Sequence, residues 1–176
     1  MPDTAGAAEW SALSADEVER RVTRLLAAHA ASLSRLARAY VKDKADRDDL
    51  LQDIVVAIWR ALPHFRGECS ERTFLFRIAH NRAIAYITRR RHHTIEVSEE
   101  MEIQDARPNP EEALSTEQQG RRLLDAVQRL PLNHRQAVTL MLEGLSYSEI
   151  ADVLGITETN VGARLTRARQ LLRKLL

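Results

Sequence analysis

The chain has 176 residues, of which 44% are hydrophobic and 29% charged, the balance of a folded, water-soluble protein. A single cysteine, Cys69, excludes an internal disulfide framework and a multi-thiolate zinc site. No run approaches the roughly 18 apolar residues of a membrane span, and the first ten residues lack a secretory signal, so we expect a cytoplasmic protein without membrane insertion.

Glycine, proline and aromatic residues are few, which favours helices over a turn-rich β fold. Residues 1–16 show no hydrophobic period and are predicted to be disordered. From Glu17 to Tyr40, apolar residues recur three and four positions apart, which predicts an amphipathic helix. His29 lies within this stripe and is expected to be an ordinary core histidine, because no second metal ligand is spaced near it.

Two more helices are predicted in the first half of the chain. One lies between a polar break at 42–46 and Pro63, with Asp46 as its N-cap. Its apolar residues come in adjacent pairs, which makes the stripe wide. The other runs from about Glu71 to Arg90, after a loop around Gly67, and ends in a basic run.

Charge is distributed unevenly along the chain. Residues 1–93 carry a net charge of +4, residues 94–119 carry −7, and residues 120–176 carry +4. The acidic strip contains Pro108 and Pro110 and no sustained period, so residues 94–115 are predicted to be a flexible linker between two helical domains, 17–93 and 116–176. Basic blocks suit nucleic acid, although solvated helix faces would carry the same charges.

The second domain carries a helix-turn-helix pattern. Two amphipathic helices, at about 123–130 and 133–143, precede Gly144. Ser146 and Glu149 form a capping box for a short helix, Gly155 occupies the turn, and Thr157 caps the last helix. Four polar side chains are predicted on the exposed face of that helix: Asn160, Arg164, Arg167 and Arg169. Asparagine and arginine pair with base edges in the major groove.

These motifs resemble those of the extracytoplasmic-function (group IV) sigma factors of the bacterial sigma-70 family. The resemblance covers about residues 17–176. The second domain matches in the run Gly-Leu-Ser-Tyr-Ser-Glu-Ile-Ala at 144–151, in Gly155 and in Val161. The first domain matches in Asp-Asp-Leu-Leu-Gln-Asp at 48–53, in Trp59, in the loop 65–67 and in Arg-Ile-Ala-His-Asn at 77–81.

The resemblance implies an all-α fold of two small helical domains joined by a flexible acidic linker, the second with a helix-turn-helix. It implies a subunit that binds core RNA polymerase, at the β′ clamp helices and the β flap, and directs promoter recognition, melting and transcription initiation. A stress or envelope response and an anti-sigma partner are also implied. We expect no catalytic site, metal, cofactor or small-molecule substrate.

In this family the Asp-Leu-x-Gln-Asp helix docks on the β′ clamp helices. The corresponding residues are Asp49, Leu50, Gln52, Asp53 and Ile54. The apolar members would also serve as internal core, whereas Gln52 and Asp53 are expected to face the polymerase.

The loop and third helix resemble the reader of the −10 element, in which the loop holds a flipped base. The implied contacts are His64, Phe65, Arg66, Ser70, Asn81, Arg82, Arg89 and Arg90. Two interpretations of Phe65 stay open: a stacking surface for the base, or a core anchor beneath the loop. The arginines either follow phosphates or form a solvated helix C-terminus.

The helix-turn-helix resembles the reader of the −35 element. The implied contacts are Ser146, Thr157, Asn160, Ala163, Arg164, Arg167 and Arg169. Gly162 and Ala163 depart from the family, which commonly has a basic residue followed by serine there, so the promoter sequence is not predicted.

Two other functions are weighed. A free-standing helix-turn-helix regulator that binds operators as a dimer would not need the motifs at 49–53 and 65–81. A nuclease acting through carboxylates is the other, but a proline-containing linker is a poor place for preorganised ligands. Cys69 is expected to be an ordinary small side chain. His92 and His93 are expected to be solvated, because adjacent helix residues do not face one site.

Overall fold

The computed structural model describes residues 14–95 and 116–176, with side chains at 14–90 and 118–176. Residues 1–13 and 96–115 lie outside this range, and with them most of the predicted disordered N-terminus and linker. Two boundaries are corrected. The first helix already begins at Ala15, after a Ser14–Glu17 capping box, and residues 94–95 of the predicted linker are helical.

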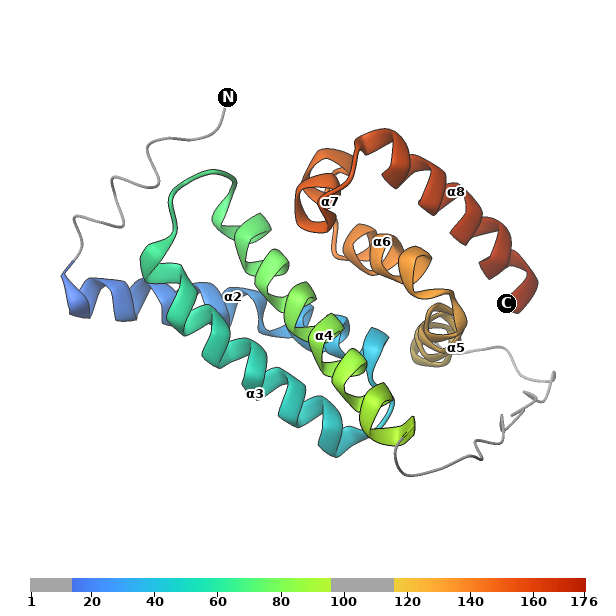
Figure 1. Ribbon diagram of the computed structural model, residues 1–176, viewed down its shortest axis with the longest axis horizontal. Helices are drawn as coiled ribbons and strands as arrows, with labels where there is room; N and C mark the ends of the chain where they lie inside the picture. The colour runs from blue at the N-terminus through green and yellow to red at the C-terminus, as the bar shows by residue number, and fades with distance from the viewer. Residues whose placement is uncertain (1–13, 96–115) are drawn as a thin grey trace.

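Three helices build the first domain: α2 (Ala15–Tyr40), α3 (Lys44–Ala61) and α4 (Glu71–Ile95), with a short 3-10 turn (Leu62–His64) after α3. They pack around a common core, with α3 lying along α4 (Figure 1). The fully buried side chains of this core include Leu36, Leu50, Ile54, Ile58, Leu62, Leu75 and Phe76. The loop 65–70 joins the 3-10 turn to the start of α4.

The start of α3 differs from the prediction. Asp43, not Asp46, is the N-cap, because its backbone is extended and its Oδ1 accepts a hydrogen bond from the Asp46 amide at 3.1 Å. Asp46 is instead inside the first turn. The helix therefore begins three residues earlier than the hydrophobic pattern indicates.

Four helices build the second domain: α5 (Thr116–Arg129), α6 (Leu132–Leu142), α7 (Tyr147–Leu154) and α8 (Glu158–Leu175). The predicted capping box of Ser146 and Glu149 is present. Gly155 ends α7 in the left-handed conformation, φ 65°, which lets the chain turn sharply into α8. Val161, Leu165 and Ala168 hold α8 against the domain core. The predicted helix-turn-helix is confirmed.

The two domains touch each other. The N-terminal end of α4 lies beside α7, and α2 contacts α5 and α6 (Figure 1). Buried apolar residues form one cluster that extends through both domains. The position of each functional surface described below is therefore defined with respect to both domains.

Candidate nucleic-acid interface

The outer face of α3 carries the polar part of the predicted polymerase site. Asp49, Gln52 and Asp53 are exposed, and Val56, one turn further, is 41% exposed. These four positions follow the i, i+3, i+4, i+7 spacing of one helix face. Two acidic side chains, an amide and an apolar side chain thus stand together where a basic, partly apolar partner surface can meet them.

Leu50 and Ile54, also predicted as polymerase contacts, do not lie on this exposed face. Both are 0% exposed and belong to the core of the first domain. The exposed apolar residues of α3 are instead Val55 and Val56, which the motif did not indicate. The sequence feature that could have indicated Val55 and Val56 is the width of the apolar stripe. Adjacent apolar pairs supply more apolar residues than one buried face of a helix needs.

A cavity of about 110 Å³ lies at the loop before α4. Its lining residues are His64, Phe65, Arg66, Glu68, Cys69, Phe74 and Arg77. Phe65 is 5% exposed and its ring centroid is 4.7 Å from that of Phe74, so it anchors the loop while its ring also borders the cavity. An aromatic wall is therefore available to a flat ligand.

Arginine supplies the polar side of this cavity. Arg77 Nη2 lies 3.9 Å from Cys69 Sγ, and Arg77 Nε is buried without a hydrogen-bond partner among the described residues. A buried donor left unpaired favours a ligand that brings an acceptor. Burial raises the pKa of the Cys69 thiol, so Cys69 stays protonated near neutral pH, as expected of an ordinary small side chain.

Two further residues predicted to read the −10 element are Ser70, just before α4, and Asn81, inside it. Ser70 caps α4: its Oγ accepts from the Thr73 amide at 3.0 Å and lies 2.8 Å from Thr73 Oγ1. Asn81 is exposed one turn beyond Arg77, and is not among the residues lining the cavity. Sequence reasoning missed Phe74 and Arg77 as lining residues, although their spacing to Asn81 places all three on one face of a helix.

The predicted arginine track at the C-terminal half of α4 is exposed but partly paired. Arg89 lies 3.6 Å from Asp53 and stacks over Tyr86, and Arg90 forms an ion pair with Asp46. Arg82 is also exposed. These contacts tie α4 to α3, and surface pairs of this kind are weak enough to exchange for phosphates.

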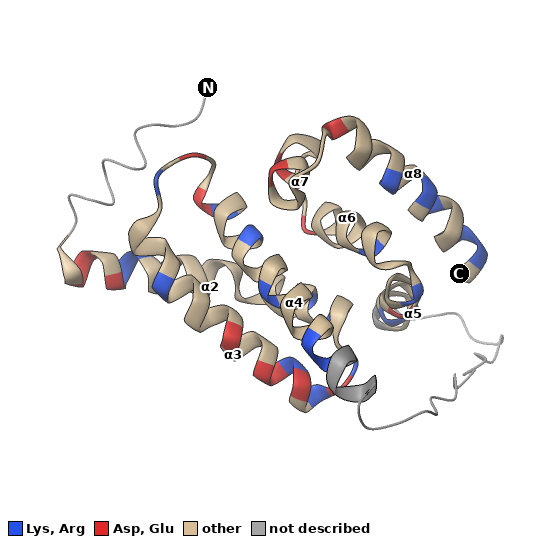
Figure 2. Cartoon of the chain, in the orientation of Figure 1, with Lys and Arg blue, Asp and Glu red and all other residues tan. Residues whose placement is uncertain are grey.

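Of the predicted residues of the helix-turn-helix, Arg164 is half-buried and the others are exposed. Figure 2 shows basic positions along α8 after its acidic first turn. The Ser146 and Thr157 hydroxyls accept hydrogen bonds from the Glu149 and Asn160 amides at 3.2 Å, so both residues cap helices. Asn160 Oδ1 accepts from Arg164 Nε at 3.1 Å, which aligns the two side chains. Ala163, Arg167 and Arg169 are also exposed.

Arg169 faces a different direction from the other basic residues of α8. At about 100° per residue, it lies about 180° around the helix from Asn160, whereas Arg164 and Arg167 lie within about 40° of it. A helix inserted in a groove cannot present both sides to the same base pairs. Arg164 and Arg167 are therefore the residues placed to join Asn160 at one surface.

Both halves of the chain match known protein families. Residues 25–93 match the family model of sigma-70 region 2, and residues 120–172 match that of sigma-70, region 4. The RNA polymerase sigma factor NccH of Alcaligenes xylosoxydans xylosoxydans is 31% identical over 158 residues, which cover 87% of this chain and 85% of that protein. The chain belongs to the sigma-70 family. The ECF RNA polymerase sigma factor SigM of Mycobacterium tuberculosis (strain H37Rv) is 30% identical over 175 residues, 90% of this chain and 86% of that protein, which places this sigma factor in the extracytoplasmic-function group.

Solved structures agree with this assignment. CnrH in complex with the cytosolic domain of CnrY matches with a TM-score of 0.68 and 27% identity, over 99% of this chain and 97% of that one. RpoE in complex with the anti-sigma factor NepR, from Bartonella quintana, matches in fold with a TM-score of 0.70 and 23% identity, over 87% of this chain and 94% of that one. Among the described helices of this sigma factor, none is long and apolar enough to cross a membrane.

Family membership decides between the functions weighed from the sequence. A sigma factor directs RNA polymerase to promoters and supports transcription initiation. A dimeric operator-binding regulator and a carboxylate nuclease do not account for a region 2 followed by a region 4. The first domain is called region 2 below, and the second region 4.

Proposed function

We propose that region 2 of this sigma factor binds core polymerase through the outer face of α3 and holds a flipped base of the −10 element in the cavity beside Phe65. We further propose that α8 of region 4 reads the −35 element. The observation that carries the proposal is the cavity, because it combines an aromatic wall with an unpaired buried donor.

The chemistry of the cavity suits a nucleobase. A base extruded from the opened duplex offers a flat ring for stacking on an aromatic side chain and carbonyl or ring-nitrogen acceptors for Arg77. Arg66, exposed on the same loop, is placed for the adjoining phosphates. Such a pocket acts only once the strands separate, so it couples recognition to melting.

The surface of α8 suits the major groove. Asn160 and Arg164 are linked at the N-terminal end of the helix, where a recognition helix meets base edges. Arg169, on the other side, is placed for a phosphate, which positions the helix without reading sequence.

A protein partner is proposed on the basis of the similar structures. CnrH and RpoE are each described in complex with another protein, in the second case an anti-sigma factor. We propose that an anti-sigma factor likewise holds this chain in the cytoplasm until a stress or envelope signal releases it.

Run-off transcription with purified core polymerase tests the proposed function. Wild-type protein is expected to give discrete start sites, and permanganate is expected to mark opened thymines at the −10 element. Arg77→Gln should reduce the permanganate signal while leaving closed-complex binding intact. Arg129→Gln, an exposed arginine of α5, is the matched control.

The outcomes separate the two halves of the proposal. No start-site specificity with wild-type protein would refute the promoter-directing role. If permanganate reactivity with Arg77→Gln equals that with wild type, only the proposed role of the cavity is refuted. Phe65→Ala is a poor test, because loss of a buried ring destabilises region 2 by about 3–5 kcal/mol.

A further inference from the structure

A second cavity, of about 590 Å³, lies between the first half of α2 and the start of α4. It shares no lining residue with the cavity beside Phe65. Six of its seven lining residues belong to α2, and the seventh is Glu71, the first residue of α4. Its volume falls within the roughly 300–1,000 Å³ of small-molecule sites in proteins. Three of the seven residues are arginines, so the cavity has the chemistry of an anion site.

Both carboxylates of this cavity already have partners. Glu17 completes the capping box of α2, where its Oε2 accepts hydrogen bonds from the Ser14 amide at 2.8 Å and the Ser14 hydroxyl at 2.6 Å. These bonds, together with the charge of Arg20, lower the pKa of Glu17, which therefore stays ionised. Glu71 accepts from Arg21 Nη2 in an ion pair between α2 and α4. The negative charge of the cavity is therefore largely committed to contacts within the protein.

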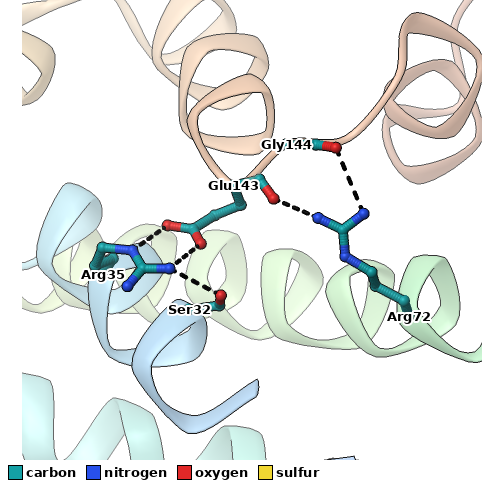
Figure 3. Close-up of polar contacts among 5 residues, drawn as sticks. All are labelled: Ser32, Arg35, Arg72, Glu143 and Gly144. Carbon is teal, nitrogen blue, oxygen red and sulfur yellow. Dashed lines mark hydrogen bonds and ion pairs between the residues drawn. The ribbon is translucent and has the colours of Figure 1, made fainter. Parts of the chain in front are cut away.

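Two arginines of the cavity have no such partner. Arg20 and Arg24 are exposed, and neither side chain forms a hydrogen bond or an ion pair with a residue that the structure describes. Other arginines of the same two helices show the contrast. Arg35 of α2 is paired with the Glu143 carboxylate, and Arg72 of α4 donates to the Glu143 backbone carbonyl (Figure 3). Arg20 and Arg24 thus keep guanidinium donors that a ligand can use.

Helix geometry brings the three guanidinium groups of the cavity to one side of α2. At about 100° per residue, Arg24 lies about 40° around the helix from Arg20 and about 60° from Arg21. Residues four positions apart lie about 5–6 Å from each other, so Arg20 and Arg24 can both contact one ligand that carries more than one phosphate. The planar fork of arginine matches the oxygens of a phosphate group, which makes such contacts strong and directional.

The remaining walls of the cavity favour a compact organic ligand over a nucleic-acid strand. Leu25 and Ala28 follow Arg24 directly and one turn later, so an apolar surface adjoins the arginines. Glu17 lies one turn before the arginines, and Glu71 faces them from α4. A strand crossing this surface would carry its phosphates past a carboxylate, and like charges repel. A ligand with its phosphates in one place and an apolar part beside them avoids both carboxylates.

We propose that this cavity binds an organic diphosphate or polyphosphate, of which a nucleoside diphosphate is the simplest example. Its phosphates bind Arg20 and Arg24, and its organic part lies against Leu25 and Ala28. Arg21, held by Glu71, adds a third positive charge and ties α2 to α4 beside the ligand. The inference does not rest on the proposed function, because none of these residues belongs to the surfaces assigned to polymerase or promoter.

Isothermal titration calorimetry of the full-length protein at low salt tests the site, with ADP, inorganic pyrophosphate and adenosine as probes. We expect one ADP per chain, weaker binding of pyrophosphate, which lacks the organic part, and no binding of adenosine, which lacks the charge. The double variant Arg20→Gln, Arg24→Gln should bind ADP at least about tenfold more weakly, because it loses two charge-assisted contacts. Both side chains are exposed, so thermal unfolding without ligand should match that of wild type.

Arg129→Gln combined with Arg173→Gln is the matched control, because these exposed arginines lie at the ends of α5 and α8 and the variant loses the same charge. Its affinity for ADP should stay within about twofold of wild type.

Four results would overturn the proposal. The first is the absence of ADP binding, and the second is adenosine binding as tight as that of ADP. The third is an equal loss of ADP affinity in both double variants, because attraction would then follow net charge alone. The fourth uses a ten-nucleotide oligothymidylate: if the loss of Arg20 and Arg24 weakens its binding but not that of ADP, the surface serves a nucleic-acid strand. Pyrophosphate binding as tight as that of ADP would overturn the role of Leu25 and Ala28.

Discussion

Tyr40 and His80 meet in the interior of region 2, where the Tyr40 hydroxyl lies 3.2 Å from His80 Nδ1. Tyr40 is the last residue of α2 and His80 lies in α4, so the pair connects two helices of region 2. Burial lowers the pKa of His80 to about 4 and raises the pKa of Tyr40. Both groups are therefore neutral over the physiological range.

This pair predicts acid sensitivity of the fold. The unfolded chain takes up a proton at His80 near pH 6.5, whereas the folded protein does so only near pH 4. Stability is therefore fully present above about pH 6.5 and is lost as the pH falls toward 4, by about 3 kcal/mol in all. Urea unfolding should show a loss of about 1 kcal/mol between pH 7 and pH 5.5 from this residue.

His80→Gln provides the comparison for that measurement. Its stability should vary less between pH 7 and pH 5.5 than that of the wild type, even if it is lower throughout. Burial also lowers the pKa of His29 and His134, so some pH dependence is retained in the variant. Equal slopes for the two proteins would show that His80 titrates normally.

The face of α3 gives a second prediction, on polymerase affinity. Asp53→Arg combined with Gln52→Ala should weaken association with core polymerase by about tenfold or more, because a reversed charge opposes a basic partner surface. Circular dichroism and thermal stability should stay close to wild type, since both side chains are exposed. A quantitative pull-down reads the affinity.

Leu50→Ala is the contrasting variant. It removes a fully buried side chain and should destabilise region 2 by about 2–5 kcal/mol. Wild-type polymerase affinity in the Asp53→Arg, Gln52→Ala protein would rule out the outer face of α3 as the contact.

Arg164 and Arg169 are predicted to have different roles in recognition of the −35 element. Arg164→Ala should cost about 1–3 kcal/mol in binding and relax the preference at one or two base pairs, since Arg164 shares a surface with Asn160. Arg169→Ala should weaken all sequences alike and lower the salt slope by about one unit. Titration of duplex −35 fragments across a salt series distinguishes the two patterns. The assignment fails if Arg169→Ala changes the preferred sequence and Arg164→Ala does not.

Gly162 offers a prediction about the stability of α8. A Cβ placed there would lie 3.6 Å from Tyr147 Cε2, an ordinary contact, and the residue is inside a regular helix. Gly162→Ala should therefore stabilise the protein by about 1 kcal/mol. Gly162→Arg should also raise DNA affinity through an added cation. Weaker DNA binding by both variants would show that the backbone approaches DNA closely at this position.

Gly155→Ala is the matched control, because the same substitution should have the opposite effect there. Gly155 has φ 65°, a conformation that an alanine adopts only with strain. Thermal unfolding of the two variants should shift in opposite directions.

Local signals in the sequence determined most of the secondary structure. The capping box of Ser146 and Glu149, the left-handed Gly155 and the Thr157 cap were predicted and are present, because each depends on groups within a few residues of one another. The same locality explains why Asp46 was wrongly predicted as the N-cap of α3. Asp43 and Asp46 are three residues apart, and the sequence alone did not say which of them would cap the helix.

Only the tertiary structure decided which residues of each motif are exposed and can contact a partner. In the motif at 49–54, Leu50 and Ile54 are four residues apart and share the helix face that packs into the core. Gln52 and Asp53 point to the other side of the helix and are exposed. The pairing of Arg35 with Glu143 joins residues 108 positions apart. No local pattern links such positions, because their contact depends on how two separately folded helical domains pack.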